Sequence, residues 1–219
     1  MQLLHIDSSI SGGQSVSRQL SAGIVTQLKQ TNPALDIVYR DLADSPVPLL
    51  TEQLHIRRLK VLSEADESAE TAAYTAQGQD IAELQLQQET AIVIAALNEF
   101  LAADIVVIGA PMYNFSIPSQ LKAWIDCLVA PGKTFRYTQN GIQGLIGGKR
   151  IIVASARGNL YSAPSPTAAL DHQESYLSSI FDTLGASGID FVRAEGVNLG
   201  SEQRQQALDS ALAEIATLN

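Results

Sequence analysis

The chain has 219 residues, a formal net charge of −9 and one cysteine. This length suits one α/β domain with a substantial core. The acidic balance argues against a broad surface for nucleic acid or anionic membranes, because such surfaces depend on clustered lysine and arginine. No apolar run approaches the roughly 18 residues of a membrane helix. The N-terminus lacks the basic segment of a secretory signal, and the single Cys127 suits a reducing compartment, so we expect a cytoplasmic protein.

Short apolar runs alternate with helical patterns along the chain, which predicts a doubly wound parallel sheet with helices on both faces. The length and spacing favour the flavodoxin-like strand order 2-1-3-4-5. The expected strands are Gln2–Asp7, Asp36–Tyr39, Ile105–Ile108, Ile151–Ala154 and Ile189–Arg193, and Gly109-Ala110-Pro111 is expected to end the third. The expected helices run from about Ser15 to Gln30, from about Asp80 to Leu101, from the turn at Pro118, and over His172–Leu184 and Glu202–Leu218.

We expect residues 1–219 to form a single domain. Two segments depart from the simple alternation of strands and helices. Thr51–Gln88 is rich in Ala, Glu, Gln and Ser, and it predicts a helical excursion at about residues 51–80 with one or two helices. A disordered linker at Glu64–Gln77 is the alternative. In Phe135–Gly141 the Asn-Gly pair is a strong turn pattern, so a small hairpin or another ordered excursion is expected there.

A serine-rich loop follows the first expected strand. Ser9, Ser15 and Ser17 offer hydroxyls, and amides around Val16 stand at a helix start, where a phosphate binds without lysine. The loop matches neither a dinucleotide fingerprint nor a Walker A motif. Serines that merely cap the helix are the alternative. In the 2-1-3-4-5 order the first and third strands are neighbours, so this loop should face the loop after the third strand.

That second loop reads Met112-Tyr113-Asn114-Phe115. Its aromatic and amide side chains suit a flat ligand with a hydrogen-bonding edge, because Asn114 offers both a donor and an acceptor. Large side chains that only fill the core are the alternative. At the carboxyl end of a strand in an open α/β sheet, the pattern favours a bound flavin.

These segments resemble the FMN-dependent NADH azoreductases, which are also NAD(P)H:quinone oxidoreductases of the flavodoxin-like superfamily. The matching segments are Ser8–Ile10, Ser15–Ser17, Gln19–Ser21, Ala110–Phe115, Gln120–Lys122, Thr134–Thr138 and Ala194–Gly196. The resemblance implies that Ser9 and Ser15–Ser17 hold the FMN phosphate and that Met112–Phe115 hold the ring. It also implies ring contacts from Ala156, Arg157, Gly158 and Asn159, where the family usually reads Ser-Arg-Gly-Gly. Asparagine tolerates positive φ, so we expect the turn at Asn159 to survive.

The resemblance further implies the reaction. FMN would take hydride from NADH or NADPH and pass two electrons to a quinone or azo compound, with ping-pong kinetics. Homodimers with the sites at the interface are implied, and Tyr137 would line the cavity unless it is a packed hairpin residue. A flavodoxin-type electron carrier without its own substrate is the alternative function, and a nucleotide-binding regulator is a third. Cys127 is interpreted as a buried apolar residue, and the three histidines lack metal-ligand spacing.

Overall fold

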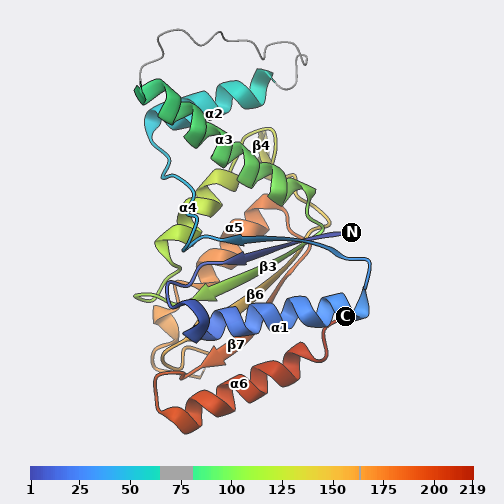
Figure 1. Cartoon of the computed structure of the whole chain (residues 1–219), viewed down its shortest axis with the longest axis vertical. Helices are drawn as coiled ribbons and strands as arrows, with labels where there is room; N and C mark the ends of the chain where they lie inside the picture. Colours follow the sequence, from blue (N-terminus) through green and yellow to red (C-terminus); the bar gives the residue numbers. More distant parts are fainter. Residues whose placement is uncertain (65–80, 163) are drawn as a thin grey trace.

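A five-stranded parallel sheet runs through the centre of the molecule (Figure 1). The computed structural model describes residues 1–64, 81–162 and 164–219. The strands of this sheet are β1 (Gln2–Asp7), β2 (Asp36–Asp41), β3 (Ile105–Pro111), β6 (Arg150–Arg157) and β7 (Ile189–Glu195). Their spatial order is β2-β1-β3-β6-β7, which is the predicted 2-1-3-4-5 order.

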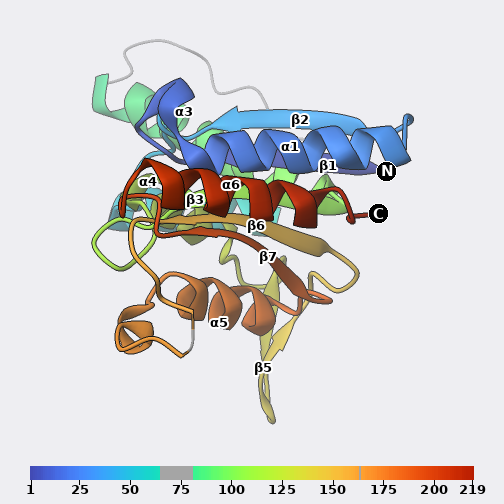
Figure 2. The same cartoon turned by 90° about the horizontal axis from the view of Figure 1, so that it is seen from below.

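Helices cover both faces of the sheet (Figure 2). On one face lie α1 (Val16–Thr31) and α6 (Ser201–Ile215). The other face packs against α3 (Ile81–Ala102), α4 (Ser119–Leu128) and α5 (Glu174–Leu184). In α1 the buried Leu20, Ile24 and Leu28 recur every four residues, which is the spacing of one helical face. The sheet thus separates two cores.

Strand β3 continues through Pro111, so the expectation that Gly109-Ala110-Pro111 ends it was wrong. Pro111 pairs with Ala156 at the very end of the ladder, where a missing N–H group costs little. Gly109 lies beside Asp7 of β1 in the register. A Cβ on Gly109 would stand 2.2 Å from Oδ1 of Asp7, so the glycine permits a close strand contact. The loop therefore begins at Met112.

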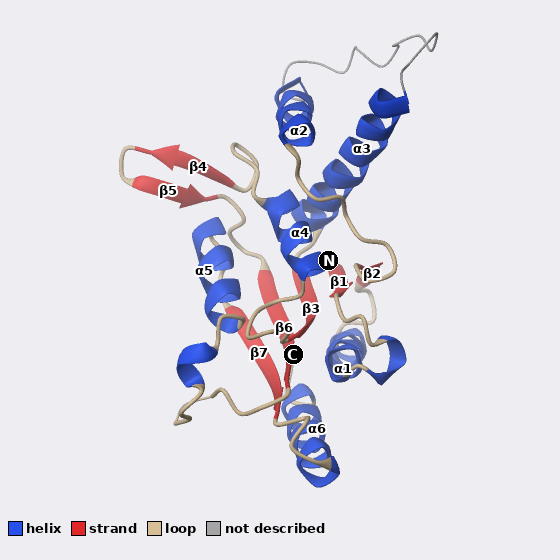
Figure 3. Cartoon of the chain, turned by 90° about the vertical axis from the view of Figure 1, so that its left-hand side faces the viewer, coloured by secondary structure: helices blue, strands red, loops and turns tan. Residues whose placement is uncertain are grey.

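The excursion contains α2 (Glu52–Glu64), which packs beside α3 (Figure 3). Arg58 of α2 is 1% exposed and donates hydrogen bonds to three carbonyls at the end of α4: those of Asp126 (3.1 Å), Cys127 (3.2 Å) and Val129 (3.2 Å). The last carbonyls of a helix have no partner within it, so the arginine satisfies them. Apart from Glu64 itself, the alternative linker at Glu64–Gln77 lies outside the described residues.

The predicted hairpin is confirmed. Strands β4 (Phe135–Thr138) and β5 (Gly141–Gly144) pair in antiparallel register and project away from the sheet (Figure 2). Gly144 meets the end of α5 so closely that a Cβ would lie 2.1 Å from the carbonyl carbon of Leu184. Across residues 1–64, 81–162 and 164–219, we find no helix with the length and apolar character that a membrane crossing requires.

Candidate functional site

Two loops meet at the carboxyl ends of β1 and β3. The hydroxyl of Tyr113 lies 3.3 Å from Oγ of Ser9 and accepts a hydrogen bond from the amide of Ile10 at 3.2 Å. Below them, the amide and hydroxyl of Ser8 both donate to the carbonyl of Gly109. The prediction that the serine-rich loop faces the Met112–Phe115 loop is confirmed.

The serine-rich loop leads directly into α1. Ser15 is the N-cap of that helix: its Oγ accepts from the amide of Arg18 and lies 3.0 Å from Oγ of Ser17. Capping is therefore one role of these serines. The amides of Val16 and Ser17 stand in the first turn, where no carbonyl of the helix can accept from them. Ser9, Ser15 and Ser17 are all buried, and Ser15 and Val16 keep only 5% of their surface exposed, so these groups are largely shielded from water.

The loop after β3 closes as a tight turn. Tyr113 and Ser116 exchange hydrogen bonds between their backbone groups, at 2.9 and 3.0 Å. Between them, Asn114 and Phe115 both have positive φ, at 48° and 72°. Positive φ at both central residues defines a type I′ turn, in which the second residue is usually glycine. Phenylalanine there costs of order 1–3 kcal/mol, and strain of this kind tends to cluster at functional sites.

The loop after β6 presents amides rather than carbonyls. Each carbonyl from Ala156 to Asn159 already accepts a backbone hydrogen bond, in turn from Met112, Val197, Asn198 and Gly196. The amides of Gly158 and Asn159 donate to no acceptor in the part of the chain that is described. Among the described non-glycine residues, positive φ occurs at Asn114 and Phe115, so Asn159 does not adopt the positive φ that asparagine tolerates. The turn survives without that conformation, and Oδ1 of Asn159 accepts from the amide of Leu160.

The guanidinium of Arg157 points away from this edge and is 1% exposed. Its Nη1 lies 3.0 Å from Oε1 of Glu195, its Nη2 lies 3.0 Å from Oδ2 of Asp171, and it also contacts Glu174. Burial alone would raise the pKa of Glu195, but hydrogen bonds from residues 161 and 162 and the charge of Arg157 together lower it. Only the backbone of Arg157 is therefore available to a ligand at this loop.

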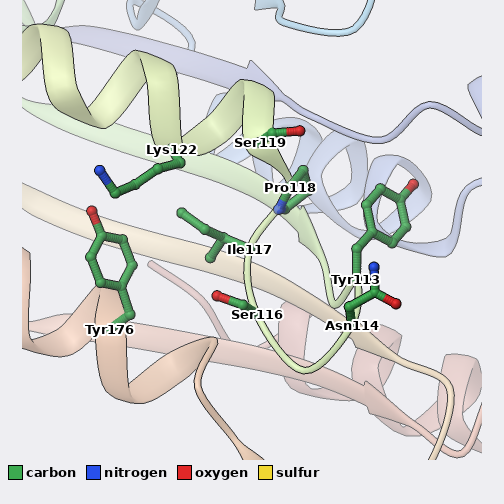
Figure 4. Close-up of a pocket in the computed structure, with 8 residues that line it drawn as sticks. All are labelled: Tyr113, Asn114, Ser116, Ile117, Pro118, Ser119, Lys122 and Tyr176. Carbon is green, nitrogen blue, oxygen red and sulfur yellow. The ribbon is translucent and has the colours of Figure 1, made fainter.

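A cavity of about 440 Å³ opens beside the turn, between α4 and α5 (Figure 4). Lys122 and Tyr176 point toward each other across it. Lys122 is paired with Asp126 of the same helix at 2.6 Å. Burial, together with the charge of Asp126, raises the pKa of Tyr176 to about 12, so its phenol stays neutral and can donate a hydrogen bond. The lining residues are Tyr113, Asn114, Ser116, Ile117, Pro118, Ser119, Lys122 and Tyr176.

Two further residues singled out in the sequence lie elsewhere. Tyr137 is 75% exposed on the hairpin, with its ring edge-on to Phe135 at 5.3 Å, and it does not line the cavity. Cys127 is buried in α4, and burial raises the pKa of its thiol to about 11, which confirms its interpretation as an apolar core residue.

Comparison with known proteins identifies the family. A family model described as flavodoxin-like fold matches residues 1–218. The chain belongs to this family. It is 49% identical to an FMN-dependent NADH:quinone oxidoreductase of Sinorhizobium medicae, over 100% of this chain and 97% of that one. It is 48% identical to a protein of the same name from Laribacter hongkongensis, over 100% of both chains. An azoreductase structure from Bacillus anthracis superposes with a TM-score of 0.82 at 28% identity, over 99% and 97% of the two chains.

The groups present in this member of the flavodoxin-like family fit FMN. A phosphate needs hydrogen-bond donors, and the start of α1 provides first-turn amides and serine hydroxyls next to the positive end of a helix dipole. A flavin ring edge carries several acceptor atoms, and the amides of Gly158 and Asn159 are unused donors. Sequence reasoning missed Arg18, which lies behind the serine-rich loop and donates to the carbonyl of Ser9. Its place in the first turn of the helix, three residues after the N-cap Ser15, was the available clue.

Proposed function

We propose that the chain is an FMN-dependent oxidoreductase that takes hydride from NADH and reduces quinones, with azo compounds as further acceptors. The observation that carries this proposal is the convergence of three loops at the carboxyl ends of β1, β3 and β6. Tyr113 joins the first two, and the hydrogen bond from Met112 to Ala156 joins the second and third. The relatives named above support the choice of cofactor and substrates.

At the phosphate end, the chain would bind an anion without a lysine or arginine side chain in contact with it. The hydroxyls of Ser9 and Ser15 and the amides of Val16 and Ser17 would hold the phosphate, supported by the α1 dipole. The hydroxyl of Ser17 orients that of Ser15 through their 3.0 Å contact. Because these donors are buried, they lose little to competition with water.

At the ring end, Met112–Phe115 and the backbone of residues 156–159 would hold and orient the flavin. Bound FMN supplies two-electron hydride chemistry. The turn fixes Phe115, whose ring lies 6.4 Å from that of Tyr161 in an edge-on contact. Its carbonyl also accepts from the amide of His172, so the strained turn is anchored at its tip. A turn fixed in this way would position the reacting partners and exclude water. Holding the reactants in the right geometry raises the rate.

We further propose a cytoplasmic homodimer in which NADH or NADPH and the acceptor use the site in turn, giving ping-pong kinetics. Support for a dimer comes from the projecting hairpin, where Tyr137 pairs with Ile142 and both stay exposed. A second copy packed against this hairpin would cover them, and it would bring Tyr137 to the rim of a substrate cavity. Sedimentation at micromolar concentration tests the dimer: a monomer would remove this part of the proposal.

The central test is anaerobic. Protein loaded with FMN should lose the flavin absorbance on addition of NADH and regain it on addition of a benzoquinone. Asn114→Gly keeps positive φ at the turn but removes the amide, so it should weaken FMN binding by roughly 1–3 kcal/mol. Asn140→Gly, in the exposed hairpin turn, is the matched control and should bind FMN like the parent. A flavin that neither NADH nor NADPH reduces would exclude the oxidoreductase and leave the electron carrier.

A further inference from the structure

Arg18 reaches back from the first turn of α1 to the underside of the serine-rich loop. Its Nε and Nη2 both donate to the carbonyl oxygen of Ser9, at 3.2 and 2.8 Å. The Oγ of Ser9 meanwhile faces Tyr113 on the other side of the loop. Ser9 is thus fixed from two directions by side chains that come from outside the loop.

The remaining donors of Arg18 are also engaged. Nη1 donates to Oδ2 of Asp41 at 2.6 Å and to the hydroxyl of Tyr39 at 3.2 Å, and Nη2 donates to Oδ1 of Asp41 at 2.7 Å. A guanidinium has five N–H donors, and all five are accounted for. A phosphate at the serine-rich loop therefore finds no free N–H group on this arginine.

Two carboxylates, those of Asp7 and Asp41, lie behind the serine-rich loop close to Arg18. Asp7 is buried at the end of β1, accepts from the hydroxyls of Ser21 and Tyr39, and lies 3.7 Å from Nη1 of Arg18. Asp41 lies on the neighbouring strand. The nearby His5 has its Nε2 at 3.6 Å from Asp7. Without Arg18, two carboxylates would stand behind an anion-binding loop with no arginine between them.

We propose that Arg18 is a positioning residue that holds the serine-rich loop in its phosphate-binding shape through the carbonyl of Ser9, without touching the phosphate. The inference rests on the proposed FMN function and assigns a role to the ion pair between Arg18 and Asp41. The planar guanidinium is required because it contacts Ser9 and Asp41 at once in a fixed geometry. A lysine ammonium carries the same charge but cannot reproduce that paired contact.

The experiment compares flavins with and without the phosphate. Apo-protein is titrated with FMN and with riboflavin, and binding is followed by quenching of flavin fluorescence. Arg18→Met should weaken FMN binding about tenfold and riboflavin binding less than about twofold, since the lost contacts shape only the phosphate end. Arg18→Lys should not restore the ratio of the two affinities. Arg40→Met is the matched control, because Arg40 forms a similar pair with Glu99 at 18% exposure, against 15% for Arg18.

The outcomes separate the inference from the function on which it rests. If the parent protein fails to bind FMN, the proposed function fails. If the parent binds FMN but Arg18→Met weakens both flavins equally, the arginine only supports the fold and the inference is overturned. Full recovery in Arg18→Lys would overturn it as well, since charge alone would then suffice. Should Arg18→Met not fold, Asp41→Asn keeps the arginine but loosens its anchor, and an unchanged ratio of FMN to riboflavin affinity in that variant would overturn the inference.

Discussion

Replacing Arg157 by methionine should destabilise the protein strongly. The guanidinium is 1% exposed and contacts the carboxylates of Asp171, Glu174 and Glu195. Removing one partner from a buried ionic cluster typically costs 3–5 kcal/mol, because uncompensated charge stays behind. Here Arg193 still pairs with Glu174 at 2.8 Å, and the three carboxylates keep 12–16% exposure through which water can reach them. We therefore expect the free energy of unfolding to fall by about 3 kcal/mol, at the lower end of that range.

Urea denaturation of the apo-protein, followed by circular dichroism at several pH values, measures this loss. Arg193→Met is the matched control: Arg193 belongs to the same cluster but is 42% exposed, so about 1 kcal/mol is expected. In the parent, the pKa of Glu195 is lowered, so its stabilising contribution is complete above the unfolded pKa of about 4.3 and is lost as the pH falls through the lower folded value. In Arg157→Met, protonation removes the repulsion among the carboxylates that have lost their partner. The difference in unfolding free energy between the variant and the parent should therefore become smaller as the pH falls. A loss no larger than that of Arg193→Met, or a gap that widens in acid, would refute the reasoning.

Three further predictions concern single groups. Tyr113→Phe removes the hydroxyl that contacts Ser9 and Ile10, so FMN should bind about tenfold more weakly in a fluorescence titration, and an unchanged affinity would contradict a bridging role. Phe115→Gly relieves positive φ, so the urea midpoint should rise by the equivalent of about 0.5–1 kcal/mol while turnover with quinone falls. A lower midpoint would argue against backbone strain. Cys127 should react with a thiol reagent at pH 8 only after unfolding, because burial holds the pKa of its thiol at about 11. Rapid labelling of the native protein would contradict this.

The strand order was predictable because alternating strands and helices leave few topologies for a chain of this length. The end of β3 was not. Glycine and proline ordinarily end a strand, but Gly109 is needed for its close approach to Asp7, and Pro111 sits at the last ladder position. Both reasons concern a neighbouring strand, which local sequence patterns do not reveal.

At the site, topology alone brought Ser9 and Tyr113 together, because the two loops leave adjacent strands. The direction of the Arg157 side chain could not be predicted, since its carboxylate partners come from a separate loop, helix and strand that meet only in the folded chain. The same holds for Arg18, whose partner Asp41 ends the neighbouring edge strand. Backbone requirements were visible in the sequence, and long-range side-chain pairing was not.

The hydrogen bonds of Arg58 connect the excursion to helix α4. Helix α4 begins just after the strained turn, and its far end is gripped by an arginine that belongs to the excursion. The helix therefore connects the strained turn at one end with the excursion at the other. A sequence change in α2 that shifts Arg58 would tilt helix α4 and move the turn, although α2 contributes no lining residue to the cavity. A change in the excursion thus acts from a distance on the turn and on the cavity beside it.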